Sequence, residues 1–414
     1  MSDGGRVDYT WGMKAMREMM VAAVVSVVVC AGFAWGRQAT TEQAGQPAEL
    51  MRLPVVNNAV LTELAAQVVL VHDTPGVGIA VVTKEGLHAF GVAGVRKSGA
   101  PDRLTTEDVF HLGSCGKMMT GVLLLRLEEQ GRVDLSLPLG KVFPEWNVDG
   151  RFAGVTVGDL LRHRGGIAGS EEGEQLAFLR AGAGDPAGSR ARLAERVLTG
   201  AAREDSGKEG GFAYSNVGYA IAGHVAERAA GMPFEALMQR EVFAPLGITT
   251  AGFGAPGVRG KVLQPFGHVG LATPVEIGPF ADNPPGFAPA GTMHMSLRDW
   301  GRFVAVVLGG GPEGFLGVAA RAKLVAPPAG AVVGDEVNPT YAMGVSITGL
   351  RGREVYTHAG SNTIWFAQLL MVPAYEVGGV KSGGWAVMVA TNHGREPGRK
   401  ATREVIQELQ ALSK

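Results

Sequence analysis

A serine and a lysine stand three positions apart where the segment VFHLGSCGKMMTGVLLLRLEEQG, residues 109–131, becomes apolar. At the start of a helix, residues i and i+3 share a face, so Ser114 and Lys117 can touch while Cys115 points elsewhere. The apolar residues that follow predict a buried helix. Burial and the positive end of the helix dipole both favour a neutral lysine amine, which could accept the serine proton. The alternative is a serine N-cap followed by a lysine that extends to solvent.

A second pair of polar side chains occurs in FAYSNVGYAIAGHVAERAAG, residues 212–231. Tyr214 and Asn216 are two positions apart in an extended segment ahead of a predicted helix, so their side chains face the same way. A phenol can relay a proton between a nucleophile and a leaving group, and an amide can hold a substrate carbonyl. Each residue also has a structural alternative, as a core aromatic and as a helix cap.

The third candidate motif is His-Ala-Gly in VYTHAGSNTIW, residues 355–365, at the end of a strand-like run. A strand edge next to a nucleophile can align a substrate by backbone hydrogen bonds, and Gly360 would permit close approach. The backbone amides of Ser361 and Ser114 would then supply the two donors of an oxyanion hole. The alternative for His358 is that it packs beneath the sheet and holds Gly360 in place.

The sequence offers little for other kinds of chemistry. Lys plus Arg number 38 and Asp plus Glu number 39, which argues against a basic stripe for nucleic acid. The nine histidines form no H-E-x-x-H pattern, and neither G-x-S-x-G nor a nucleotide-binding glycine motif occurs. We therefore expect no metal, no organic cofactor and no nucleic-acid partner, and a small molecule or peptide as the substrate.

Residues 1–36 have the layout of an export signal. Arg6, Lys14 and Arg17 precede an apolar run, residues 19–35, which ends in small residues suited to cleavage. The run is also close to the length of a single membrane anchor, so a cleaved signal peptide and a retained membrane anchor both stay open. We expect an exported protein, periplasmic or extracellular. Only two cysteines occur and one lies in this run, so no internal disulfide is expected.

The spacing of apolar residues predicts an α/β (α+β) fold. After a polar linker, 37–54, a helix and a hairpin begin the folded part, and four strand-like runs and an amphipathic helix end it. The predicted architecture is an antiparallel sheet built from both chain ends (55–113 and 291–414) and flanked by terminal helices. A mainly helical domain, 114–290, is inserted, and its last part, 254–290, is a long Gly- and Pro-rich connection. Helices are expected at 114–130, 156–163, 189–199, 217–230, 234–244 and 296–308.

Taken in order, S-x-x-K, Tyr-Ser-Asn and H-x-G resemble the motifs of the serine beta-lactamase and penicillin-binding-protein superfamily. The similarity is to its class C beta-lactamase-like branch, which includes D-alanyl-D-alanine carboxypeptidases, D-aminopeptidases and esterases. It spans roughly residues 55 to 412. Three connecting stretches also carry the resemblance: VTVGDLLRHRGGIAG, FAPLGITTAGFG and PAGTMHMSLRDWGRF.

The resemblance implies roles for these residues. Ser114 would form an acyl-enzyme, and Lys117 and Tyr214 would share the general base and acid work. Asn216 would bind the acyl side of the substrate, and the H-x-G strand would line the opposite side of the cleft. Which of Lys117 and Tyr214 takes the first proton stays open.

Two departures from the family pattern concern the substrate. Many members have Lys-Thr-Gly at the third motif, which suits a substrate carboxylate, whereas His358 would be mostly neutral at pH 7 and Ala359 offers no hydrogen bond. Ile364 and Trp365 stand where the family often has a glycine, and they would narrow the cleft.

These departures predict a serine hydrolase that acts weakly on beta-lactams and better on small esters or amides. Activity on carboxylate-bearing substrates would rise as His358 protonates toward pH 6. The alternatives are a slowly deacylating penicillin-binding or beta-lactam sensor module, a D,D-carboxypeptidase and a true class C beta-lactamase.

Overall fold

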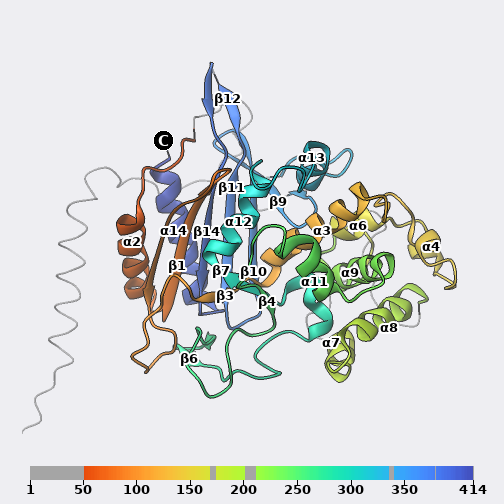
Figure 1. The fold of residues 1–414 in the computed structure, drawn as a ribbon, viewed down its shortest axis with the longest axis horizontal. Coiled ribbons are helices and arrows are strands. Elements are labelled where there is room, and N and C mark those ends of the chain that lie inside the picture. Colours follow the sequence, from red (N-terminus) through yellow and green to blue (C-terminus); the bar gives the residue numbers. More distant parts are fainter. Residues whose placement is uncertain (1–50, 168–173, 201–210, 335–339, 378, 414) are drawn as a thin grey trace, which may run out of the picture. The chain divides into compact units, whose positions relative to one another are not determined.

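Seven antiparallel strands from the two ends of the chain form the main sheet, in the order β2-β1-β14-β11-β10-β9-β8 (Figure 1). Their bounds are β1 (Gly76–Thr83), β2 (Gly86–Gly94), β8 (Thr340–Tyr341), β9 (Ser346–Leu350), β10 (Arg353–Ser361), β11 (Phe366–Val372) and β14 (Trp385–Thr391). Strand β14 lies between β1 and β11, so the last strand joins the N-terminal hairpin to the rest of the sheet.

The computed structural model describes residues 51–167, 174–200, 211–334, 340–377 and 379–413, which all belong to one compact unit. The predicted signal or anchor, 1–36, and the linker up to residue 50 lie outside these residues. Within them, no helix has the length and apolar character needed to cross a membrane. The expected boundary between a sheet domain and an inserted domain stays a prediction.

Strand β1 is buried on both faces, which explains its continuous apolar sequence GVGIAVVT. Val77, Ile79 and Val81 belong to a core with helices α2 (Asn58–Val71) and α14 (Glu396–Ala411). The alternate residues Ala80 and Val82 belong to a second core on the other face, with helix α12 (Leu297–Val307). The two terminal helices therefore cover one face, and the helical part of the chain builds against the other (Figure 1).

The helical part lies between the two halves of the sheet in the chain. Its regular elements are η2 (Gly113–Gly116), α3 (Lys117–Glu129), α4 (Leu139–Val142), α5 (Gly150–Ala153), α6 (Val157–Leu161), α7 (Glu174–Ala181), α8 (Pro186–Leu198), α9 (Asn216–Ala230), α10 (Phe234–Met238), the π-helical turn η3 (Gln239–Phe243), η4 (Pro285–Phe287) and α11 (Ala288–Gly291). Helix α13 (Val318–Val325) follows α12 and packs on α3.

Smaller sheets connect these layers. Strand β7 (Met293–Ser296) pairs with β3 (Val109–His111) and β4 (Gly252–Phe253), which links the start of the helical part to its end. The long Gly- and Pro-rich segment holds one short hairpin of β5 (His268–Val269) and β6 (Thr273–Pro274). A further hairpin, β12 (Tyr375–Val377) with β13 (Val380–Ser382), interrupts the path from β11 to β14.

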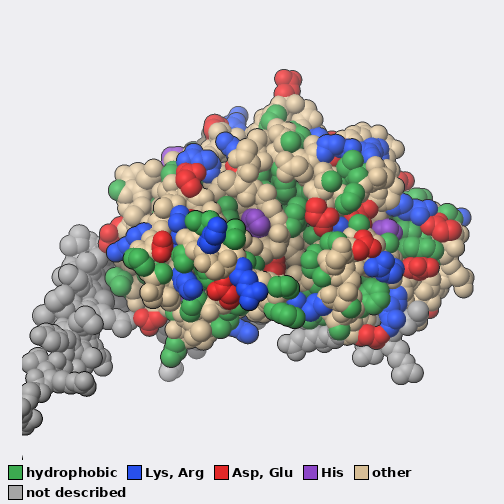
Figure 2. Space-filling model, turned by 60° about the horizontal axis from the view of Figure 1, so that its bottom comes forward, with side chains coloured by type: hydrophobic (Ala, Val, Ile, Leu, Met, Phe, Trp, Pro, Cys, Tyr) green, Lys and Arg blue, Asp and Glu red, His purple; other side chains and the backbone are tan. Residues whose placement is uncertain are grey.

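The predicted fold class is confirmed, with an antiparallel sheet from both chain ends and helices between them. The first predicted helix differs, because its opening turn is a 3-10 turn. The helix predicted at 189–199 begins earlier, since Asp185 caps it by accepting a hydrogen bond from the Gly188 N–H. On the face drawn in Figure 2, positive and negative side chains are interspersed, in line with the balanced composition.

Candidate active site

Ser114 lies in the 3-10 turn η2, which leads directly into helix α3. A 3-10 turn has three residues per turn, so side chains at positions i and i+3 eclipse one another. The Lys117 N–H donates to the Ser114 carbonyl oxygen, and Lys117 Nζ lies 3.0 Å from Ser114 Oγ. The turn therefore aligns the serine and the lysine more directly than the predicted α-helix would have done.

The Lys117 side chain is completely buried, with an exposed fraction of 0%. Besides Ser114 Oγ, its Nζ lies 2.7 Å from Asn216 Oδ1 and 2.6 Å from the Ala290 carbonyl oxygen. Helix α3 is apolar on almost every side, and its neighbours close the core around the amine. The alternative of a lysine that extends to solvent is wrong.

Tyr214 and Asn216 are also brought to Lys117. Ser215 is the N-cap of α9, and its Oγ accepts a hydrogen bond from the Gly218 N–H at 2.9 Å. The cap is thus one residue earlier than expected, and Asn216 directs its side chain to the lysine instead. The Tyr214 ring lies beside the same amine, with its centroid 4.8 Å from Nζ.

The H-x-G strand reaches the nucleophile through two glycines. A methyl group added at Gly360 would lie 2.0 Å from the Leu112 carbonyl oxygen and 2.7 Å from the Ser114 nitrogen. One added at Gly113, whose φ is +51°, would lie 2.3 Å from the Ser361 nitrogen. Backbone meets backbone here, because neither residue has a side chain to hold the two segments apart. The amide nitrogens of Ser114 and Ser361 are therefore neighbours across this contact.

His358 points into the protein. Its Nδ1 donates to the Ala359 carbonyl oxygen at 2.7 Å, so Nε2 is left to accept from the Tyr341 hydroxyl, also at 2.7 Å. Burial lowers the pKa of His358 from 6.5 to about 3. The expected protonation toward pH 6 is therefore wrong, and the ring matches the alternative of packing beneath the sheet.

The substrate-facing part of this strand is its backbone. Strand β9 pairs with β10 only from Arg353 to Thr357, so residues 358–361 continue beyond that pairing. The side chain of Ala359 is exposed, on the side of the strand opposite to His358. This stretch can align an extended substrate through main-chain hydrogen bonds.

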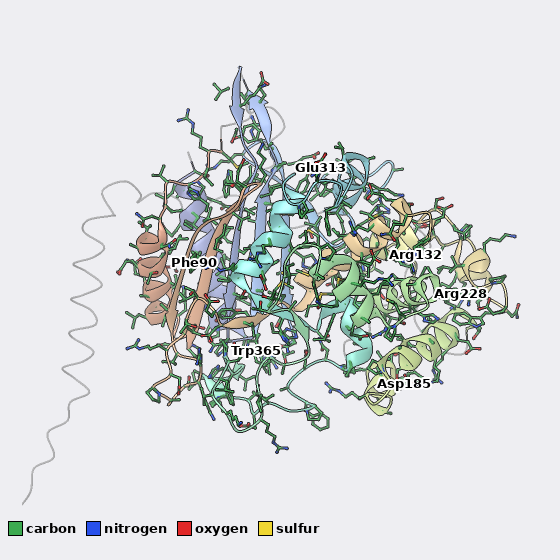
Figure 3. All side chains as sticks on the ribbon, viewed as in Figure 1. Phe90, Arg132, Asp185, Arg228, Glu313 and Trp365 are labelled. Atoms are coloured by element: carbon green, nitrogen blue, oxygen red, sulfur yellow. The ribbon has the colours of Figure 1, made fainter. Side chains whose placement is uncertain are left out.

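The expectation that Ile364 and Trp365 narrow the cleft is wrong. Both residues instead anchor the long Gly- and Pro-rich segment. Both are buried, and they form a separate small core with Phe266, Ile277 and Ala281. Trp365, labelled in Figure 3, also stacks on His111, with ring centroids 5.7 Å apart. This core holds the segment against the end of the main sheet.

Comparison with known proteins identifies the family. The Beta-lactamase family profile matches residues 59–411, which is most of the chain. The chain belongs to the beta-lactamase family.

Among curated members, it is 29% identical over 311 residues to penicillin-binding protein 4 of Amycolatopsis lactamdurans, covering 73% of this chain and 78% of that protein. It is 32% identical over 191 residues to esterase EstB of Burkholderia gladioli, covering 42% and 46% of the two chains. The fold matches a class C beta-lactamase from Rhodobacter sphaeroides with a TM-score of 0.63 at 19% identity, over 85% of this chain and 98% of that one. The predicted superfamily is thus confirmed, and this beta-lactamase-family protein is a serine hydrolase.

Sequence patterns did not reveal the aromatic cluster behind the motifs. His163 is buried, its Nδ1 accepts the Ser215 N–H at 3.1 Å, and its ring lies 4.2 Å from that of Tyr214 and 4.5 Å from that of Tyr341. Burial lowers the pKa of His163 to about 2, so the ring is neutral. Each of these residues stands alone in its own segment, and only the fold brings them together.

Proposed function

We propose that Ser114 is the nucleophile of a covalent acyl-enzyme and that Lys117 removes its proton. The observation that supports this most directly is the buried Lys117 amine, 3.0 Å from Ser114 Oγ. A neutral amine has two N–H groups and one lone pair. Asn216 Oδ1 and the Ala290 carbonyl oxygen can take the two N–H groups, which leaves the lone pair for the Ser114 hydroxyl.

In the acylation step, the Ser114 proton moves to Lys117 Nζ while Oγ bonds to the substrate carbonyl carbon. The carbonyl oxygen becomes an oxyanion, which accepts hydrogen bonds from the Ser114 and Ser361 amides. When the tetrahedral intermediate collapses, the bond to the leaving group breaks, and the leaving group takes a proton relayed through Lys117 and Tyr214. Water then attacks the acyl-enzyme by the reverse proton transfers and releases the acid.

In this scheme Asn216 binds the acyl side of the substrate through its Nδ2 group, since its Oδ1 is engaged by Lys117. His358 supports Gly360 from behind, and the strand backbone, rather than the imidazole, contacts the substrate. Two observations favour small esters or amides over beta-lactams. The third motif carries no cation for a carboxylate, because His358 is buried and neutral. The similarity to an esterase points the same way.

The test is active-site labelling followed by a substrate screen. Purified protein from residue 37 onward should react with a fluorescent fluorophosphonate, and Ser114→Ala should not. Unlabelled protein from the same preparation is then screened against nitrocefin, short acyl p-nitrophenyl esters, D-alanyl-D-alanine peptides and D-amino acid amides. Labelling that persists in Ser114→Ala would exclude the assignment, and turnover of nitrocefin above that of every ester and amide would exclude the proposed substrate class.

A second candidate is a slow penicillin-binding module, which the similarity to penicillin-binding protein 4 favours. Such a protein would form the same acyl adduct but release it slowly. Fluorescent penicillin separates the two functions: an adduct that persists for hours supports the binding module, whereas steady turnover of any ester or amide supports the hydrolase.

We also propose that the protein is exported through residues 1–36, because of their charged and apolar layout. The precursor should have the full length. Outside the cytoplasm we expect either a shorter chain, if the signal is cleaved, or a full-length chain bound to the membrane, if it is retained as an anchor. Mass spectrometry of the mature N-terminus after cell fractionation distinguishes cleavage from anchoring. Retention of the full chain in the cytoplasmic fraction would contradict export.

A further inference from the structure

A buried histidine holds the backbone just before the nucleophile. His111, at the end of strand β3, is fully buried, and its Nδ1 accepts the Gly113 N–H at 3.1 Å. The ring nitrogen that accepts carries no proton, so the hydrogen-bond pattern assigns the proton to Nε2. Nε2 lies 2.9 Å from Asp282 Oδ2 and donates to it. The carboxylate thus fixes the tautomer that lets His111 hold Gly113.

The Asp282 carboxylate also binds Asn362, the residue that follows Ser361, whose backbone amide is the second donor of the oxyanion hole. Asn362 directly follows Ser361, and its Nδ2 donates to Asp282 Oδ1 at 2.9 Å. Its Oδ1 in turn accepts the Trp365 N–H at 3.1 Å. Both ends of the Asn362 amide are therefore engaged, which fixes the turn between β10 and β11.

Asp282 itself is well placed for this bridging role. It lies in the Gly- and Pro-rich segment, its side chain is 6% exposed, and its Oδ1 also accepts the Asn283 N–H at 2.7 Å. Three segments that are far apart in the sequence meet at this one side chain: the end of β3, the end of β10 and the loop before η4.

We infer that Asp282 is a positioning residue that aligns both halves of the oxyanion hole, one through His111 and Gly113 and the other through Asn362. The inference rests on the proposed acylation at Ser114. The two amides belong to different segments, yet both must lie within hydrogen-bond distance of one oxygen atom. A single acceptor shared by both segments sets their relative position, and small errors in such positions reduce rates strongly.

Asp282→Asn tests the inference with little change of shape. Asn has one acceptor oxygen and one NH₂ group, whereas the site supplies donors to both carboxylate oxygens. If the NH₂ group faces His111, that ring must move its proton to Nδ1, where it can no longer accept the Gly113 N–H. If the NH₂ group faces Asn362 instead, donors oppose each other there. Either orientation loosens one half of the oxyanion hole.

We expect Asp282→Asn to lower kcat on a p-nitrophenyl ester about 10-fold to 100-fold, less than the loss from deleting an oxyanion donor outright, with KM changed little. The affinity for a phenylboronic acid, whose adduct with Ser114 places an oxygen in the oxyanion hole, should fall by a similar factor. Asp299→Asn is the matched control, since this buried aspartate accepts hydrogen bonds from the Thr249 and Thr250 backbones and touches neither half of the site.

A second pair of variants acts at the histidine. Asn can place its amide oxygen where His111 Nδ1 lies, so His111→Asn can retain the bond to Gly113, whereas His111→Gln extends past Nδ1 and reaches only toward Asp282. We expect His111→Asn to keep more activity than His111→Gln at equal stability. The pair also provides the test if Asp282→Asn does not fold.

The outcomes distinguish a failure of the proposed acylation at Ser114 from a failure of the positioning role of Asp282. If the wild-type protein is not labelled at Ser114 by fluorophosphonate, the proposed function fails. If it is labelled but Asp282→Asn keeps wild-type kcat and boronate affinity, or loses them no more than Asp299→Asn does, the positioning role is overturned. Wild-type activity in both His111 variants would likewise overturn it, since each variant breaks one bond of the connection from Asp282 through His111 to Gly113.

Discussion

Replacing Gly360 by alanine adds one methyl group at the point where strand β10 meets the nucleophile turn. The added Cβ would lie 2.0 Å from the Leu112 carbonyl oxygen, 2.7 Å from the Ser114 nitrogen and 2.8 Å from the Cys115 nitrogen. All three are backbone atoms, so no side chain can rotate away. Ordinary contact requires the strand and the turn to separate by roughly 1 Å or more.

A displacement of this size moves the Ser361 amide relative to Ser114. Because misplacement by about 1 Å can cost about 100-fold in rate, we expect kcat on a p-nitrophenyl ester to fall at least 100-fold in Gly360→Ala. The φ of Gly360 is not in the left-handed region, so the effect comes from space and not from backbone strain. Fluorophosphonate labelling should slow in parallel.

The matched control is Gly349→Ala on the neighbouring strand β9. An added Cβ there would meet only the Gly334 carbonyl oxygen, at 3.9 Å, which is ordinary contact. This variant should keep wild-type kcat. If Gly360→Ala retains more than a tenth of wild-type kcat while folding normally, the close backbone contact does not set the catalytic geometry and the reasoning is refuted.

Three further predictions concern the buried polar groups. Lys117→Arg should lose about 100-fold to 10,000-fold in acylation rate, because guanidinium does not act as a base, and near wild-type single-turnover kinetics would contradict this. Tyr341→Phe removes the hydroxyl that donates to His358 Nε2 and should lower the free energy of unfolding by about 1–3 kcal/mol. Urea denaturation measures this change, and an unchanged midpoint would contradict the importance of the contact. Burial lowers the folded-state pKa of His163, His268 and His358 to about 2, 4 and 3, so below pH 6.5 the unfolded chain binds more protons than the folded one. The stability present above pH 6.5 should thus be lost as pH falls toward 4, by up to about 1.4 kcal/mol per histidine per pH unit, and equal urea midpoints at pH 7 and pH 5 would contradict the assignment.

The sequence predicted those parts of the site in which local spacing determines geometry. Ser114 and Lys117 are three positions apart at a helix start, so contact between them followed from the period of the backbone alone. The strands could also be predicted from the sequence, since apolar runs and the turns between them are local signals. The fold class could then be inferred from the order of elements along the chain.

The orientation of His358 could not be predicted in this way. Strand residues alternate between faces, so a shift of one position decides whether the imidazole meets substrate or core, and only the pairing with β11 sets that register. Its partner Tyr341 lies in a separate strand, and nothing in either segment indicates the other. Asp282 was missed for a similar reason, because a single aspartate in an irregular loop has no period to mark it.

The position of β14 in the sheet has a consequence for how the enzyme becomes active during folding. Thr391, at the end of β14, donates from its Oγ1 to the Gly76 carbonyl oxygen, and these residues are 315 positions apart. Ser361 is held by β11, which pairs on its other edge with β14. A folding chain can therefore form the Ser114 turn early, but the Ser361 amide of the oxyanion hole is not held in place until β14 has inserted into the sheet. Such long-range closure is slow, so in refolding experiments we expect reactivity toward fluorophosphonate to emerge with the slowest phase of sheet formation and not with the early helices.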